Sequence, residues 1–78
     1  MRNQKYHIAD LKKRQISVLD TFTGYENAAD ITDVKFTEDG ENVRISNDIF
    51  PVVVTFDQFL DLLFEGETKD KAFVYTIK

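Results

Sequence analysis

The sequence predicts a small α+β fold: an antiparallel sheet of about four to five strands with one amphipathic helix packed on one face. Three observations lead to this prediction. Apolar and polar residues alternate on both sides of an Asp-Gly turn near residues 31–46, and apolar residues recur with helical spacing near residues 56–65. The 78-residue length suits one hydrophobic core. We therefore expect residues 1–78 to form a single domain.

The predicted hairpin is the clearest element. Apolar and polar residues alternate over residues 32–37 and again over residues 43–46, and the turn between them contains Asp39 and Gly40. Glycine is typical of such turns because it adopts positive φ without a steric penalty. A turn centred here pairs the apolar residues on one face: Phe36 with Val43, and Val34 with Ile45. A two-residue turn sets like charges opposite each other, and a looser four-residue turn relieves part of that repulsion.

The predicted helix covers residues 56–65. Thr55 and Gln58 have the spacing of a capping box, in which each residue satisfies a backbone amide of the other. Gly66 follows at the position where helices commonly end in the left-handed conformation. The apolar residues form one continuous stripe, which we expect to pack on the sheet: Phe56, Phe59, Leu60, Leu63 and Phe64.

The C-terminal part contributes two further strands to the prediction. Three consecutive valines at residues 52–54 favour a short strand, which Pro51 places at a strand start or a sheet edge. Residues 67–71 are polar and predict a turn. Residues 72–77 are largely apolar and predict a final strand.

The N-terminal third is ambiguous. Residues 8–22 fit either one helix or part of a strand pair, with strands near residues 5–9 and 15–22 around a basic turn. The strand pair is slightly favoured. Residues 24–30 are polar and predict a connector.

The charge is divided unevenly along the chain. Residues 1–14 hold five basic residues and one acidic residue, a net charge of +4, whereas residues 15–78 hold five basic and thirteen acidic residues, a net charge of −8. Together they give the overall charge of −4. This division predicts an acidic surface with a short basic pole.

Several kinds of chemistry lack the residues that they need. The chain has no cysteine, which excludes disulfides and thiolate metal ligands, and His7 is its single histidine. Neither Ser17 nor Ser46 stands in the Gly-x-Ser-x-Gly turn of a hydrolase nucleophile. The three glycines lie too far apart to form a phosphate-binding loop. We expect no enzyme activity, no cofactor and no metal site.

The cellular location follows from the same features. Residues 1–10 are polar and charged, and they contain no apolar run of the length of a signal peptide or membrane helix. The absence of cysteine fits a reducing compartment. We expect a cytoplasmic protein without membrane contact, either a monomer or a homodimer.

The acidic surface suggests the leading functional hypothesis, a non-catalytic protein-binding module that engages a partner with a basic surface. Small inhibitors and regulators of phages and mobile elements have this size and charge, and mimicry of nucleic-acid phosphates is one form of the hypothesis. Carboxylates around the hairpin tip and on the helix would make the contact: Glu38, Asp39, Glu41, Asp57, Asp61 and Glu65. We expect the three helix carboxylates to face solvent.

Two alternatives remain open from the sequence. A nucleic-acid-associated protein would grip phosphates with Lys12, Lys13 and Arg14, although the acidic remainder of the chain disfavours direct nucleic-acid binding. A small structural or assembly subunit would instead pair strands across a dimer edge, using residues 52–54 or 72–77.

Overall fold

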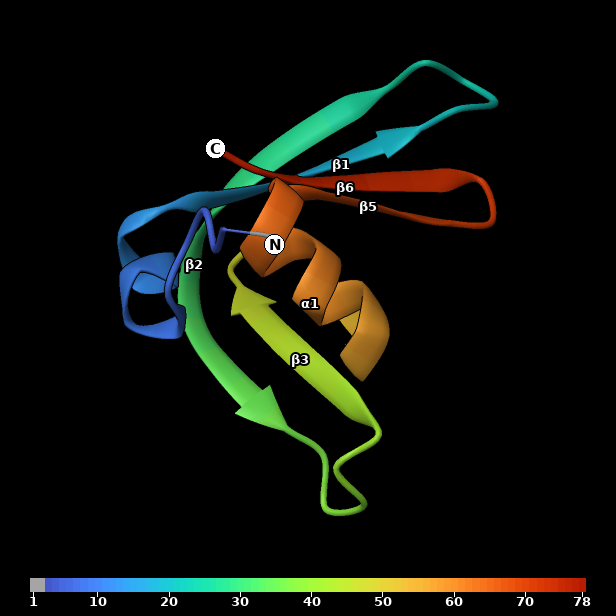
Figure 1. Ribbon diagram of the computed structural model, residues 1–78. Helices are drawn as coiled ribbons and strands as arrows, with labels where there is room; N and C mark the ends of the chain where they lie inside the picture. The colour runs from blue at the N-terminus through green and yellow to red at the C-terminus, as the bar shows by residue number, and fades with distance from the viewer. Residues whose placement is uncertain (1–2) are drawn as a thin grey trace.

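A computed structural model, which describes residues 3–78, shows one α-helix packed in the concave side of a curled antiparallel sheet (Figure 1). The predicted α+β class is confirmed, but the sheet has six strands rather than four or five, in the order β4-β3-β2-β1-β6-β5. The elements are the 3₁₀ helix η1 (Ile8–Lys13), β1 (Gln15–Asp20), β2 (Glu26–Phe36), β3 (Asn42–Asn47), β4 (Val53–Thr55), α1 (Phe56–Glu65), β5 (Glu67–Asp70) and β6 (Phe73–Ile77).

The long strand β2 joins the two halves of the sheet. Ile31 pairs with Asn47 and Asp33 pairs with Ser46, so β2 contains one more residue than β3 at this point. Such a β-bulge reverses the inward and outward alternation of the strand and bends it. Ile31 and Val34 therefore both reach the core, three residues apart. The prediction of a polar connector over residues 24–30 is wrong, because β2 begins at Glu26.

The hairpin register is confirmed. Phe36 pairs with Val43 and Val34 pairs with Ile45. The loop is the looser of the two predicted forms: the Thr37 amide donates to the Asn42 carbonyl (3.0 Å), which leaves residues 38–41 as a four-residue turn.

Strand β5 occupies residues predicted as a polar turn, and this prediction is wrong. Its four residues pair with β6, from Glu67 opposite Thr76 to Asp70 opposite Phe73. Thr68 faces α1 and is buried. A polar segment this short carries no hydrophobic alternation, so its strand conformation depends on the neighbouring β6 rather than on its own sequence.

Helix α1 begins and ends as predicted. The Gln58 amide donates to the Thr55 hydroxyl (3.1 Å), and the Thr55 amide donates to the Gln58 side-chain oxygen (2.8 Å), which completes the capping box. Gly66 follows with a φ of +78°. No helix within residues 3–78 has the length and apolar character needed to cross a membrane.

The buried face of α1 differs from the predicted stripe. Phe59, Leu62 and Leu63 are buried, whereas Phe56 is 42% exposed. Leu62 lies outside the predicted stripe, but α1 contacts β3 and β4 on one side and β5 and β6 on the other. Because the curled sheet surrounds more of the helix than a flat sheet would, the buried arc reaches Leu62.

The N-terminal prediction is half right. Strand β1 lies within the predicted strand 15–22, but residues 8–13 form η1, and no strand forms at residues 5–9. The amides of Lys5 and Tyr6 both donate to the Leu63 carbonyl at 2.9 Å, so this segment docks on the end of α1 instead of joining the sheet. Leu11, from η1, is fully buried in the core.

Candidate functional site

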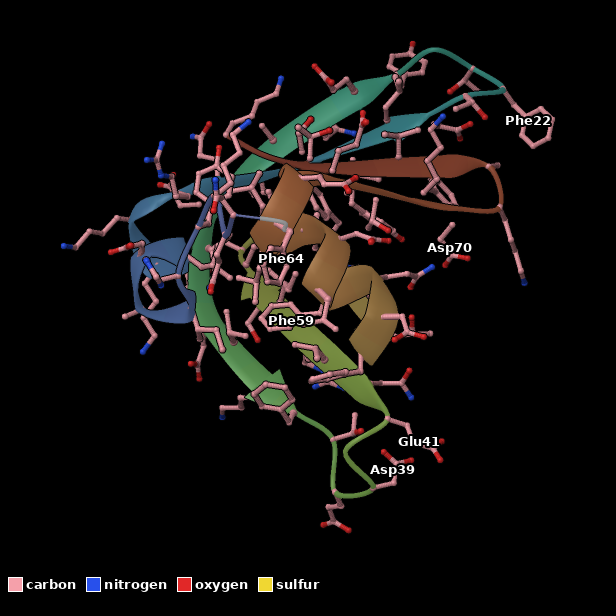
Figure 2. All side chains as sticks on the ribbon, viewed as in Figure 1. Phe22, Asp39, Glu41, Phe59, Phe64 and Asp70 are labelled. Carbon is pink, nitrogen blue, oxygen red and sulfur yellow. The ribbon has the colours of Figure 1, made fainter. Side chains whose placement is uncertain are left out.

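The tip of the β2–β3 hairpin and the start of α1 form one end of the molecule. The Phe56 amide donates to the Glu41 carbonyl (3.0 Å), and Asn42 pairs with Thr55 in the sheet. Figure 2 shows Asp39 and Glu41 on the loop that projects beyond β2 and β3. The fold therefore brings the predicted hairpin carboxylates to the same end as Asp57 in the first turn of the helix.

Two partly exposed aromatic rings lie at this end. The Phe36 and Phe56 ring centroids are 6.3 Å apart, and Phe36 also meets the Phe59 ring edge-on at 5.8 Å. Phe36 is 49% exposed and Phe56 is 42% exposed, whereas Phe59 is buried. Phe36 thus packs on a buried ring, Phe56 contacts Phe36, and both outer rings still present apolar surface to solvent.

The sequence pattern places Phe36 on the apolar face of the hairpin and Phe56 in the helix stripe, so it identifies neither ring as a surface residue. Phe36 is the last residue of β2, and Phe56 is the first residue of α1. A residue at the end of an element has fewer neighbours along the chain to cover it. This terminal position is the signal that could have identified the two rings.

Hydrogen bonds hold the hairpin tip in one conformation. The Asp39 carboxylate accepts hydrogen bonds from the Thr37 hydroxyl and from the Glu41 amide (2.9 Å). These bonds, the one from Thr37 foremost, hold the pKa of Asp39 below its usual range. Asp39 therefore keeps its negative charge to a lower pH than an ordinary aspartate does.

The other two predicted carboxylates lie farther along α1, beside β5. Asp61 is half-buried and accepts a hydrogen bond from the Thr68 hydroxyl (3.3 Å). Asp61 and Glu65 line a shallow depression of about 340 Å³ between α1 and β5, together with Gln58, Glu67, Thr68 and Lys69. The expectation that all three helix carboxylates face solvent is corrected at Asp61, because the sheet curls around this side of the helix.

The predicted basic cluster lies on η1 and directly after it, packed beside β2. Lys12 forms an ion pair with Asp33 (3.7 Å), and the Arg14 guanidinium lies 5.1 Å from the centre of the Tyr6 ring. The pKa of Asp33 is lowered, mainly by a hydrogen bond from the Val34 amide and further by nearby lysine ammonium groups. Lys12 and Arg14 are thus engaged within the chain, and Lys13 is exposed.

The two edges of the sheet are β4 and β5. The prediction that residues 72–77 could pair across a dimer edge is wrong, because β6 lies between β1 and β5. Residues 52–54 overlap β4 and do reach an edge, where Val53 is partly exposed.

Comparison of the chain with protein-family models, with curated proteins and with solved structures found no match. Within residues 3–78, no group of three or more His, Cys, Asp or Glu side chains is placed to hold a metal ion. The function of the chain must therefore be inferred from its own residues and geometry.

Proposed function

We propose that this chain is a non-catalytic, cytoplasmic protein-binding module that engages a basic partner protein through the hairpin end of the molecule. We call this region the tip surface, and it comprises Phe36, Glu38, Asp39, Glu41, Phe56 and Asp57. One observation carries the proposal: two exposed aromatic rings lie at the same end of the molecule as four carboxylates, three from the β2–β3 loop and one from α1. A surface that only keeps a protein in solution does not need exposed rings among its charges.

The two kinds of side chain have separate roles in binding. Aromatic rings at the centre of an interface supply most of the affinity, since they bury a large apolar area with few rotatable bonds. Carboxylates around them select a basic partner and accelerate encounter at low salt. The Phe59 contact and the Asp39 hydrogen bonds order this surface before binding, which lowers the entropy lost on association.

The acidic tip surface fits a partner groove that is built for nucleic-acid phosphates. Such a groove presents lysine and arginine side chains, and the carboxylates of the tip surface would occupy the positions of the phosphates. An inhibitor or regulator of a nucleic-acid-binding protein is therefore the form of partner-binding module that this surface favours.

The experiment compares capture of a partner by matched charge-reversal variants. The tagged full chain and three variants are used as bait for proteins of the source cell or its host: F36A/F56A, E41K/D57K and the control E26K/E67K. The control makes the same change in net charge on the sheet, away from the tip. We expect both tip variants to lose a basic partner that the wild type and the control retain, with thermal melts confirming that all four are folded.

Salt dependence provides the second measurement. The association rate of the isolated partner should fall with rising ionic strength for the wild type, and the fall should be shallower for E41K/D57K. Equal capture by the tip variants and the control would rule out the tip surface as the binding site.

A further inference from the structure

A second feature lies on the concave face of the sheet, near the β1–β2 and β5–β6 turns. Phe73 is directly paired with Asp20 of β1 on one side and with Asp70 of β5 on the other. Directly paired residues project from the same face of a sheet. Asp20 and Asp70 therefore project from the same face as Phe73, one from each neighbouring strand. Figure 2 shows Asp70 far from Asp39 and Glu41 of the tip surface, with Phe22 projecting from the β1–β2 turn.

The same face contains a small depression of about 270 Å³. Phe73 and Tyr75 form one wall, with their rings stacked at 6.5 Å and 27°, and Phe73 is 39% exposed. Phe50 and Pro51 from the β3–β4 loop also line the depression. Val18 and Asn27 complete the lining, which includes three aromatic rings. Asp20 and Asp70 lie next to this lining, as the strand partners of Phe73.

Asp20 is held at the β1–β2 turn, and Asp70 lies near Tyr75. Asp20 accepts hydrogen bonds from the amides of Phe22 (2.9 Å) and Thr23 (3.3 Å). Asp70 is close enough to Tyr75 that its charge adds to burial, the larger cause, in raising the pKa of the tyrosine hydroxyl. A carboxylate that disfavours a neighbouring negative charge favours a positive one in the same place.

We propose that this depression receives an arginine side chain of the partner protein. A guanidinium group can lie flat on the Phe73 ring and donate hydrogen bonds to carboxylates on either side of it. Its aliphatic stem would pack against the apolar lining at Val18 and Pro51. The proposal relies on the proposed function only for the source of the arginine, a basic partner protein.

The molecule itself contains a comparable contact. Arg14 lies over the Tyr6 ring at 5.1 Å, and Lys5 lies over the same ring at 5.7 Å. Both cation–ring contacts described within residues 3–78 are at Tyr6, so the Phe73 and Tyr75 rings carry no cation from that part of the chain. As far as residues 3–78 are concerned, these two rings are thus open to a cation from another molecule.

The probe for this site is N-acetyl-arginine methylamide, titrated into the ¹⁵N-labelled full chain and followed by NMR. The neutral analogue N-acetyl-citrulline methylamide has nearly the same shape and serves as the matched ligand. We expect saturable shifts at the amides of residues 18–22 and 70–75 with the arginine probe, and about tenfold weaker binding with citrulline.

Three variants test the named side chains. D20N retains an oxygen that can accept the turn hydrogen bonds, D70N removes the second charge, and F73L removes the ring. We expect each variant to weaken binding of the arginine probe several-fold. E67Q, on the outward face of β5, should bind as the wild type does. Any of three results would overturn the proposal. These are equal binding of the citrulline and arginine probes, tighter binding of tetramethylammonium or of the corresponding lysine probe, and no effect of D70N.

The two proposals can fail separately. F36A/F56A should bind the arginine probe normally, because the tip surface and the depression share no residue. If this variant loses the partner while the wild type shows no response to the probe, the arginine site alone is overturned. If the probe binds as expected but partner capture is unaffected by the tip variants, the tip surface alone is overturned.

Discussion

Gly66, which ends α1, packs so closely on Tyr6 that a β-carbon at residue 66 would lie 3.1 Å from the Tyr6 Cε2 atom. The adjoining amides of Lys5 and Tyr6 donate to the Leu63 carbonyl. This contact supplies donors to a carbonyl that the end of a helix would otherwise leave without one. The N-terminal segment therefore completes the C-terminal end of the helix, sixty residues away in sequence.

Gly66→Ala should destabilise the protein by more than the backbone penalty alone. Residue 66 has a φ of +78°, which costs an L-residue about 1–2 kcal/mol, and the added methyl group also meets the Tyr6 ring. Gly40→Ala is the matched control, because Gly40 has a φ of +72° with nothing within 4 Å of an added β-carbon. Urea denaturation should give a larger loss for Gly66→Ala, and equal losses would contradict the Tyr6 contact.

Phe59→Ala and Phe56→Ala should differ strongly in their effect on stability. Phe59 is 1% exposed at the centre of the core, so its truncation should cost about 3–5 kcal/mol. Phe56 is partly exposed, and its truncation should cost about 1 kcal/mol. Thermal and urea unfolding of the two variants measure this difference. Similar losses would show that Phe56 packs in the core rather than on the tip surface.

Ser17→Ala should leave stability unchanged or raise it by about 1 kcal/mol. Ser17 is buried in β1, and within the described structure its hydroxyl oxygen has no hydrogen-bond partner. Burial removes the hydration of such a hydroxyl, and no hydrogen bond replaces it. Alanine removes this desolvation cost with little change in volume. The free energy of unfolding from urea titration tests this expectation. A loss above about 1 kcal/mol would reveal a hydrogen bond at Ser17.

Tyr75→Phe should make stability less sensitive to alkaline pH. Burial, and then the charge of Asp70, raise the pKa of Tyr75 above its ordinary value. The neutral hydroxyl is therefore favoured in the folded state, and stability declines as the pH rises past about 10, where the unfolded chain ionises. Unfolding curves measured across this range should fall less steeply for Tyr75→Phe than for the wild type.

Tyr25→Phe is the control for the loss of a tyrosine hydroxyl, because Tyr25 is 74% exposed. Its stability should follow the wild-type pH dependence. The same slope for wild type and Tyr75→Phe would contradict the raised pKa of Tyr75.

The residues of the candidate sites differ in whether a local sequence pattern could identify them. The hairpin carboxylates and Asp57 could be proposed from sequence, because turns and helix starts have local signatures. Phe36 and Phe56 could not be separated from core residues, since their exposure depends on where the sheet stops covering them. No sequence pattern identified Asp20 or Asp70 as site residues. They become neighbours of Phe73 only because β1 and β5 both pair with β6.

The sequence by itself determined the elements whose chemistry is local. The capping box of Thr55 and Gln58, the end of the helix at Gly66 and the register around the Asp39-Gly40 turn each depend on residues a few positions apart. Only the tertiary structure decided the strand β5, the bulge between Ile31 and Asp33, and the rotation of the helix that buries Leu62. These features depend on which distant strands become neighbours, and on the curvature of the sheet that they form, so no local pattern specifies them.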